Sequence, residues 1–174
     1  FKDCRRLTSI VIPDGVTTIS ASAFNRCSGL TSVIIPDGVT SIGEYAFSAC
    51  TSLSSIDIPD SVTSIGNSSF YNCSSLSSID IPDSVTSIDN AAFSRCSSLT
   101  SVTIGSGVTN IGNYAFSNCR KLTSITCYAT TTPSFGGGNL FDYLPTNGVL
   151  YVPNGSDYSS WLRKLGSGWT IEYI

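Results

Sequence analysis

The sequence predicts an α/β solenoid, a stack of short coils that each use 23 residues. Three series of residues support this prediction, because each series recurs at that fixed step. The series are Phe1, Phe24, Phe47, Phe70, Phe93 and Phe116; Cys4, Cys27, Cys50, Cys73, Cys96 and Cys119; and Leu7, Leu30, Leu53, Leu76, Leu99 and Leu122. A fixed period of roughly 20 to 50 residues is typical of solenoids, in which each coil contacts only its neighbours.

Each coil begins with a short strand and a tight turn. In residues 53–58, apolar and polar side chains alternate with a period of two, and the β-branched Ile56 and Ile58 favour a pleated strand. These two side chains are expected to point inward, and Asp57 outward. Pro59 has no N–H to donate to a neighbouring strand, so the strand ends there. The Asp that follows this Pro in each coil is explained by turn formation.

The second half of the coil predicts another inward segment and a compact outer turn. Val62 and Ile65 form the inward segment, and the residue that follows begins a short helical or 3₁₀ turn on the convex side. In the preceding copy Ala46, Phe47 and Cys50 would share the inward face of that turn. One coil buries too few apolar side chains to offset the entropy cost of ordering it, so stability is expected to come from stacking.

These residues carry a family resemblance. The pattern Leu-x-x-Ile-x-Ile-Pro-Asp-x-Val-Thr-x-Ile-Gly, followed by Ala-Phe-x-x-Cys, resembles the BspA-type leucine-rich repeat, also called the Treponema pallidum type. The resemblance covers Phe1 to about Ile125, as five full copies after a partial first one. It implies a leucine-rich-repeat array from a bacterial protein, secreted or on the cell surface, with a role in adhesion and no enzymatic activity.

The period stops at Cys127, which predicts a change of structure there. We divide the chain into a leucine-rich-repeat solenoid, residues 1–126, and a C-terminal capping segment, residues 127–174. The capping segment resembles the terminal segments that often close such arrays. Its expected elements are a polar connector at 130–133, a flexible stretch at 134–138, a strand at 150–152, a helix at 156–165 with Ser156 as N-cap, and a strand at 169–174.

Composition and charge exclude two classes of partner. Charged residues make up only 12% of the chain, the net charge is −3, and Lys and Arg are not clustered as nucleic-acid binding requires. No apolar run approaches the ~20 residues that would span a bilayer, so membrane insertion of this segment is not expected. Polarity comes from Ser, Thr and Asn, which suits an extracellular surface. The chain begins inside a repeat and contains no Met, so we expect a fragment or a processed form.

The cysteines predict a ladder of buried thiols. There are seven Cys and no His, no two Cys are spaced as C-x-x-C, and one Cys follows the inward Phe in each coil. Cys at such positions acts as a small hydrophobic residue. Disulfides between neighbouring coils stay open as the alternative, provided that the Cβ vectors converge. Cys127 takes a strand position that otherwise holds Ile, and is expected in the core.

The sequence predicts no enzyme, no cofactor and no metal. The absence of His removes the commonest general base. Asp57 and Asp80 occupy the same outward position of adjacent coils and should lie about 5 Å apart. Such a pair could serve a glycosidase, or Ca²⁺ together with Ser55 and Ser78. A flat ladder offers no pocket, however, and Ca²⁺ prefers six to eight oxygens, so a solvated face is the preferred interpretation.

The outward strand positions predict a binding strip on the concave face. Solenoids use such extended faces for recognition. The strip runs through Val11, Ile34, Asp57, Asp80, Thr103 and Thr126, flanked by Ser9, Ser32, Ser55, Ser78, Ser101 and Ser124. Its predicted partner is a host or bacterial surface protein or a matrix component. Two alternatives stay open: a structural spacer, or a glycan-binding protein that uses the aromatic side chains of the capping segment, including Trp161 and Trp169.

Overall fold

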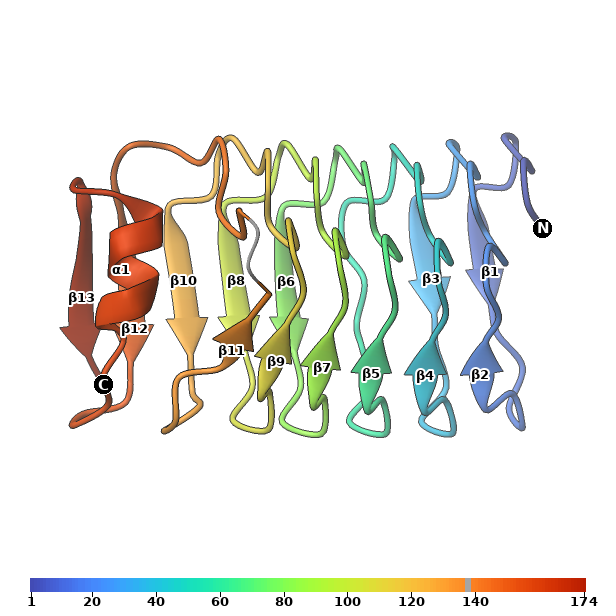
Figure 1. Cartoon of the computed structure of the whole chain (residues 1–174). Coiled ribbons are helices and arrows are strands. Elements are labelled where there is room, and N and C mark those ends of the chain that lie inside the picture. Colours follow the sequence, from blue (N-terminus) through green and yellow to red (C-terminus); the bar gives the residue numbers. More distant parts are fainter. Residues whose placement is uncertain (137–138) are drawn as a thin grey trace.

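The chain folds into a row of stacked coils that ends in a small helical segment (Figure 1). The computed structural model describes residues 1–136 and 139–174. The coils contribute to two rows of parallel strands, which lie side by side along the stack. The array is therefore a β-solenoid with 23-residue repeats, and the solenoid prediction is confirmed.

The first row of strands, called here the strand row, carries the predicted binding strip. Its members are β1 (Ser9–Val11), β3 (Ser32–Ile34), β6 (Ser78–Ile81), β8 (Ser101–Ile104), β10 (Ser124–Cys127), β12 (Gly148–Val152) and β13 (Trp169–Tyr173). Equivalent residues of successive coils lie in register, as Ser78 does beside Ser101. The row consists of a two-stranded sheet, β1–β3, and a five-stranded sheet from β6 to β13. Between these sheets, residues 55–58 keep the inward and outward alternation but form no regular strand.

The second row is continuous. It consists of β2 (Thr18–Ile19), β4 (Ser41–Ile42), β5 (Ser64–Ile65), β7 (Ser87–Ile88), β9 (Asn110–Ile111) and β11 (Ser134–Phe135), in one six-stranded parallel sheet. A ladder of threonine hydroxyls runs beside it: Thr63 donates to the carbonyl of Thr40 at 3.2 Å, and Thr86 donates to that of Thr63 at 3.2 Å. The predicted second inward segment is confirmed.

The outer segment is a run of turns rather than the expected helical or 3₁₀ turn. Its amides donate alternately within the coil and to the next coil: Ser48 N–H bonds the Tyr45 carbonyl at 3.1 Å, and Phe47 N–H bonds that of Ser69 at 2.7 Å. Tyr45 and Ala49 have φ angles of 54° and 58°. A right-handed helix requires negative φ at successive residues, so two left-handed residues in each coil prevent one from forming.

The core is built from columns of identical side chains. The Phe rings stack from coil to coil, as between Phe47 and Phe70, whose ring centroids lie 5.3 Å apart. All seven cysteines are free thiols, and all except Cys4 are buried, which confirms the thiol ladder from Cys27 onward. Each ladder thiol donates to a Phe carbonyl of the preceding coil, as Cys73 does to Phe47 at 3.2 Å.

The capping segment extends both rows and adds the helix. β11 continues the second row, and β12 and β13 continue the strand row beside β10. The expected strands at 150–152 and 169–174 are confirmed. Of the stretch expected to be flexible, Ser134–Phe135 form β11, and residues 137–138 lie outside the described residues. The division of the chain at residue 126 stays a prediction.

The helix is shorter than expected. α1 spans Ser159–Leu165, and its N-cap position is Tyr158, not Ser156. The Ser156 hydroxyl instead donates to the Pro153 carbonyl, and the Ser159 amide donates to Asp157 Oδ1 at 2.9 Å. The carboxylate of Asp157, rather than the hydroxyl of Ser156, therefore satisfies an amide at the start of the helix.

The two tryptophans close the core and are not available to a ligand. Trp161 is fully buried, its ring lies 5.5 Å from Phe141 at an interplanar angle of 65°, and its Nε1–H donates to the Pro133 carbonyl at 3.3 Å. Trp169 is 3% exposed and donates to the Pro145 carbonyl at 3.0 Å. The glycan-binding alternative is therefore wrong for these two side chains, because a sugar cannot stack on a buried ring.

Candidate binding surface

The outward residues of the strand row lie together on one face of the array, as the sequence predicts. The in-register pairing of β1 with β3 sets Val11 beside Ile34. The pairing of β6, β8 and β10 sets Asp80, Thr103 and Thr126 side by side. We use the name "strip" for these outward residues, with Asp57 and the flanking serines. Alternation of the pleat points the strip outward, because every second residue of each strand enters the core.

The character of the strip changes from one end to the other. Val11 and Ile34 are 66% and 61% exposed, which is high for aliphatic side chains. Asp57 and Asp80 are also exposed, and Thr103 and Thr126 are half-buried. The strip thus offers an apolar pair, then an acidic pair, then a pair of hydroxyls. A partner would meet these three kinds of side chain in a fixed order.

The acidic pair lies where the strand row is interrupted. A small hollow of about 150 Å³ opens there, lined by Ser55, Ile56, Asp57, Ile58, Ser78, Ile79 and Asp80. Like charges at neighbouring ladder positions destabilise strand pairing, and Asp57 and Asp80 occupy such positions. Both side chains line the hollow, and residues 55–58 form no regular strand beside β6. Ile56 and Ile58 are also more exposed, at 7% and 8%, than Ile79 at 2%.

The capping segment extends the strip, which sequence reasoning missed. Tyr151 of β12 pairs in register with Thr126, and Glu172 of β13 pairs with Tyr151. The 23-residue period ends before β12, so the counting that found the other strip residues could not reach these two. The available signal was local: outward Tyr151 lies between Leu150 and Val152, which are both fully buried.

An apolar hollow lies at the N-terminal end of the stack. It has a volume of about 430 Å³, and Ile10, Ile12, Ile19 and Phe24 are among the residues that line it. In the following coils, the equivalent side chains are buried against the preceding coil. This hollow is thus lined by side chains of the kind that form the core in later coils.

No three His, Cys, Asp or Glu side chains within residues 1–136 and 139–174 come together in a group that could hold a metal ion. Burial raises the pKa of the Cys50 and Cys119 thiols to about 12. Both thiols therefore stay protonated at neutral pH, and a protonated buried thiol is a poor nucleophile.

The sequence predicts no membrane insertion of this segment. Among the described residues, no helix combines the length and the apolar character that crossing a bilayer requires. α1, the one helix of the described chain, spans seven residues.

Comparison with protein families matches the repeats. The model for the BspA type leucine rich repeat region matches residues 1–123 in six copies. This agrees with the repeat resemblance found in the sequence, both in its period and in its extent. Comparison with curated proteins gave no match.

Several solved structures are similar to this chain. A leucine-rich repeat protein from Bacteroides ovatus is 27% identical with a TM-score of 0.61, over 90% of this chain and 52% of that one. This chain thus spans about half the length of that relative. The leucine rich repeat protein of T. pallidum is 25% identical with a TM-score of 0.63, over 95% of this chain and 86% of that one. The pneumococcal vaccine antigen PcpA has a TM-score of 0.75 over 97% of this chain and 42% of that one; at 19% identity the likeness concerns the fold alone.

Proposed function

The chain belongs to the BspA-type leucine-rich-repeat family, and from this premise we propose that it is a non-enzymatic binding module that presents the strip to a protein or matrix partner. The observation that carries the proposal is the arrangement of Val11 and Ile34 beside Asp57 and Asp80. Two exposed aliphatic side chains lie in register, and two exposed carboxylates follow them. Leucine-rich-repeat solenoids commonly use an extended face of this kind to bind proteins.

The strip supports recognition because its parts are chemically different and rigidly spaced. Neighbouring strands lie about 4.8 Å apart, so the spacing of the outward side chains is set by the backbone. An apolar contact beside a carboxylate favours a partner that carries an apolar side chain next to a Lys or Arg. Single exposed aliphatic residues are ordinary on protein surfaces, but Val11 and Ile34 adjoin each other.

We further propose that the protein acts outside the cell, either secreted or on the bacterial surface. The low content of charged residues, 12%, and the polarity supplied by Ser, Thr and Asn support this location. The partner would then be a host protein, a surface protein of another bacterium or a matrix component. Residues 1–126 would form the binding array and residues 127–174 its cap.

A binding array tests the proposal. The purified chain is applied to matrix proteins and surface proteins beside a strip variant, Ile34→Ser/Asp57→Ala/Asp80→Ala. Saturable binding that the strip variant loses by about tenfold or more is expected, because apolar contacts and charge pairs at the centre of an interface carry most of its energy.

A matched variant controls for charge and folding. Glu44→Ala/Asp89→Ala/Tyr114→Ser removes two carboxylates and one exposed apolar side chain from the outer turns, away from the strip. This variant should bind like the wild type. Equal loss in both variants would count against the strip. Absence of binding from a folded chain would favour the structural spacer.

A further inference from the structure

A second surface feature lies away from the strip, on the outer turns. Five polar residues line a hollow of about 350 Å³ there: Asn72, Arg95, Ser97, Asn118 and Arg120. They come from neighbouring coils, and none of them carries a negative charge. We propose that this hollow binds the sulfate or carboxylate group of an acidic saccharide.

The repeat itself directs these side chains into the hollow. Asn72, Arg95 and Asn118 occupy the same position in three successive coils, and their φ angles are 59°, 63° and 62°. Their amides are already used: Asn72 N–H donates to the Ser94 carbonyl at 2.8 Å, and Arg95 N–H donates to that of Ser117 at 2.8 Å. The backbone is thereby fixed. The Arg95 side chain is exposed, whereas Asn72 and Asn118 are half-buried and the Asn118 side-chain amide donates to the Ser117 hydroxyl at 3.0 Å.

Arg95 is held in place by an aromatic ring. Its guanidinium carbon lies 5.6 Å from the centroid of the Tyr71 ring, within the range of a cation–π contact. This contact restricts the side chain without neutralising its charge. A restricted guanidinium loses less conformational entropy when it binds an anion.

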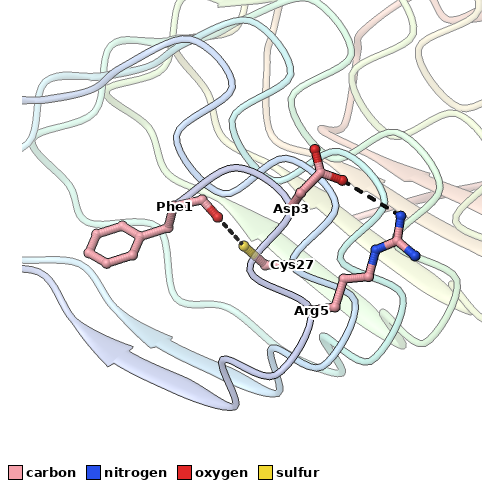
Figure 2. A network of polar contacts seen from close by, with 4 residues as sticks. All are labelled: Phe1, Asp3, Arg5 and Cys27. Carbon is pink, nitrogen blue, oxygen red and sulfur yellow. Dashed lines mark hydrogen bonds and ion pairs between the residues drawn. The ribbon is translucent and has the colours of Figure 1, made fainter.

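The first coil shows what the hollow lacks. There Asp3 occupies the position equivalent to Asn118, and Arg5 the position equivalent to Arg120. Asp3 Oδ1 lies 3.8 Å from the Arg5 guanidinium, in the ion pair that Figure 2 shows beside the bond from Cys27 to Phe1. An Asn at this position cannot neutralise the neighbouring Arg.

Both guanidiniums of the hollow are therefore uncompensated. Within residues 1–136 and 139–174, the ion pair of the first coil is the one salt bridge, so neither Arg95 nor Arg120 has a carboxylate partner there. An external anion would take the place that a carboxylate holds in the first coil. Arg binds sulfate-like and carboxylate groups through two parallel hydrogen bonds, which makes two such side chains in one hollow well suited to an oxoanion.

The remaining residues favour a saccharide as the carrier of that anion. The Asn72 and Asn118 amides and the Ser97 hydroxyl can both donate and accept hydrogen bonds, as sugar hydroxyl groups require. Tyr143 takes the next position of the same column: its φ is 60°, and it is 71% exposed. Tyr143 does not line the hollow itself, but its exposed ring, one coil beyond Asn118, offers a face for a further sugar of a bound chain. The volume also falls within the roughly 300–1,000 Å³ of small-molecule sites.

Titration calorimetry with three hexasaccharides tests the proposal. The probes are a sulfated heparin fragment, a carboxylated galacturonate oligomer and neutral maltohexaose. At least one acidic probe should bind saturably, and its affinity should fall as salt is added, because these groups are exposed. The acidic probe that binds more tightly identifies sulfate or carboxylate as the preferred group. Equal binding of maltohexaose, or no binding of either acidic probe, would overturn the proposal.

Variants at equivalent positions of different repeats distinguish binding in the hollow from a general effect of positive charge on the surface. Arg95→Asn/Arg120→Ser places in the hollow residues that the same positions hold in neighbouring coils, namely Asn72 and Ser97. It should lower the affinity at least tenfold, since each change removes a charge-assisted hydrogen bond. Arg26→Asn/Arg5→Ser makes the same two changes at the equivalent positions of the first coils and should leave the affinity unchanged. An equal loss in both variants would overturn the site.

A third variant restores the missing carboxylate. Asn118→Asp reproduces the acidic position of the first coil, and the new carboxylate should pair with Arg120 and weaken binding of the acidic probe. Unchanged affinity in this variant would contradict the role given to Arg120. The strip is untouched by all of these variants, so failure here leaves the proposed protein-binding function to its own test.

Discussion

The two rows of strands belong to the same coils but differ in continuity. The second row pairs without interruption from β2 to β11, and its outward positions hold Thr, Ser or Asn throughout. The strand row breaks at residues 55–58, and its outward positions change from aliphatic to acidic to hydroxyl. Identical in-register coils place equivalent side chains beside each other, so the outward residue of each repeat decides whether neighbouring strands are compatible.

The second row is structural and chemically uniform, whereas the strand row is variable. Hydroxyl side chains of the second row can bond the preceding coil, as Ser41 does through its hydroxyl to Thr18 at 3.3 Å. Carboxylates at adjacent positions of the strand row repel each other instead. The gap toward β6 lies between Asp57 and Asp80, where like charges would disfavour strand pairing; nothing in the structure separately explains the gap toward β3. Of the two rows, the strand row is therefore the one whose outward side chains vary in chemical kind.

The largest effect is expected from breaking the core that both rows share. Phe70→Ala removes a ring that stacks between Phe47 and Phe93, at centroid distances of 5.3 and 5.1 Å. Loss of a fully buried Phe typically costs about 3–5 kcal/mol. Urea unfolding followed by circular dichroism should show this loss, with both rows affected. Tyr114→Ala, on the exposed outer turn, is the control, and a similar loss there would contradict the account.

Alkaline pH should weaken the same core through its thiols. Burial raises the folded-state pKa of Cys50 and Cys119 to about 12, against about 8.5 in an unfolded chain. Their stabilisation is therefore complete below about pH 8.5 and is lost as the pH rises toward 12. At pH 10 each thiol should cost about 2 kcal/mol of unfolding free energy.

Unfolding in urea at pH 8 and at pH 10 measures this effect. The Cys50→Ala/Cys119→Ala variant should show a shallower decline than the wild type between the two pH values. Burial also raises the pKa of Cys73 and Cys96, so part of the decline should persist in that variant. Equal stability of the wild type at both pH values would contradict the buried protonated ladder.

A smaller effect should come from the hydroxyl ladder of the second row. Thr63→Val removes the hydrogen bond to the Thr40 carbonyl and should lower stability by about 0.5–1 kcal/mol. Thr103→Val on the strip is the comparison, because Thr103 is half-buried on the strip and lies outside the threonine ladder of the second row. If the strip variant were the more damaging of the two, the division of the rows into structural and variable would fail.

The smallest change should close the gap in the strand row. Asp57→Thr gives this coil the residue that Thr103 and Thr126 supply in later coils, and it removes the repulsion with Asp80. The expected gain in stability is about 0.5 kcal/mol, measured in urea. Asp57→Glu keeps the charge and should show no gain; a gain of equal size with Glu would mean that charge is not the cause.

The period of the sequence predicted most of the fold, because spacing alone identifies which side chains stack. It located both rows and the Phe and Cys columns, whereas β12 and β13 of the cap were predicted from local strand patterns beyond the repeats. It missed the turns of the outer segment, since left-handed residues such as Tyr45 and Ala49 carry no local signal that distinguishes them from helix formers. The gap at residues 55–58 also escaped, because it depends on a pair of neighbouring coils rather than on either one.

The sequence predicted most of the strip, as it predicted most of the fold. The strip from Val11 to Thr126 follows from the period, and the structure places these residues on one face. Its continuation through Tyr151 and Glu172 required the actual strand pairing. The basic hollow could not be found by counting, because it depends on which outer-turn side chains of several coils lie together.

Hydrogen–deuterium exchange resolved by residue tests the central comparison most directly. The amides of residues 55–58 should exchange measurably faster than those of 78–81 and 101–104, because they lack the pairing of a regular strand. The strand amides of the second row should exchange at similar rates from β4 to β9. Equal protection of 55–58 and 78–81 would contradict the account, since it would mean that the strand row is as continuous as the second one.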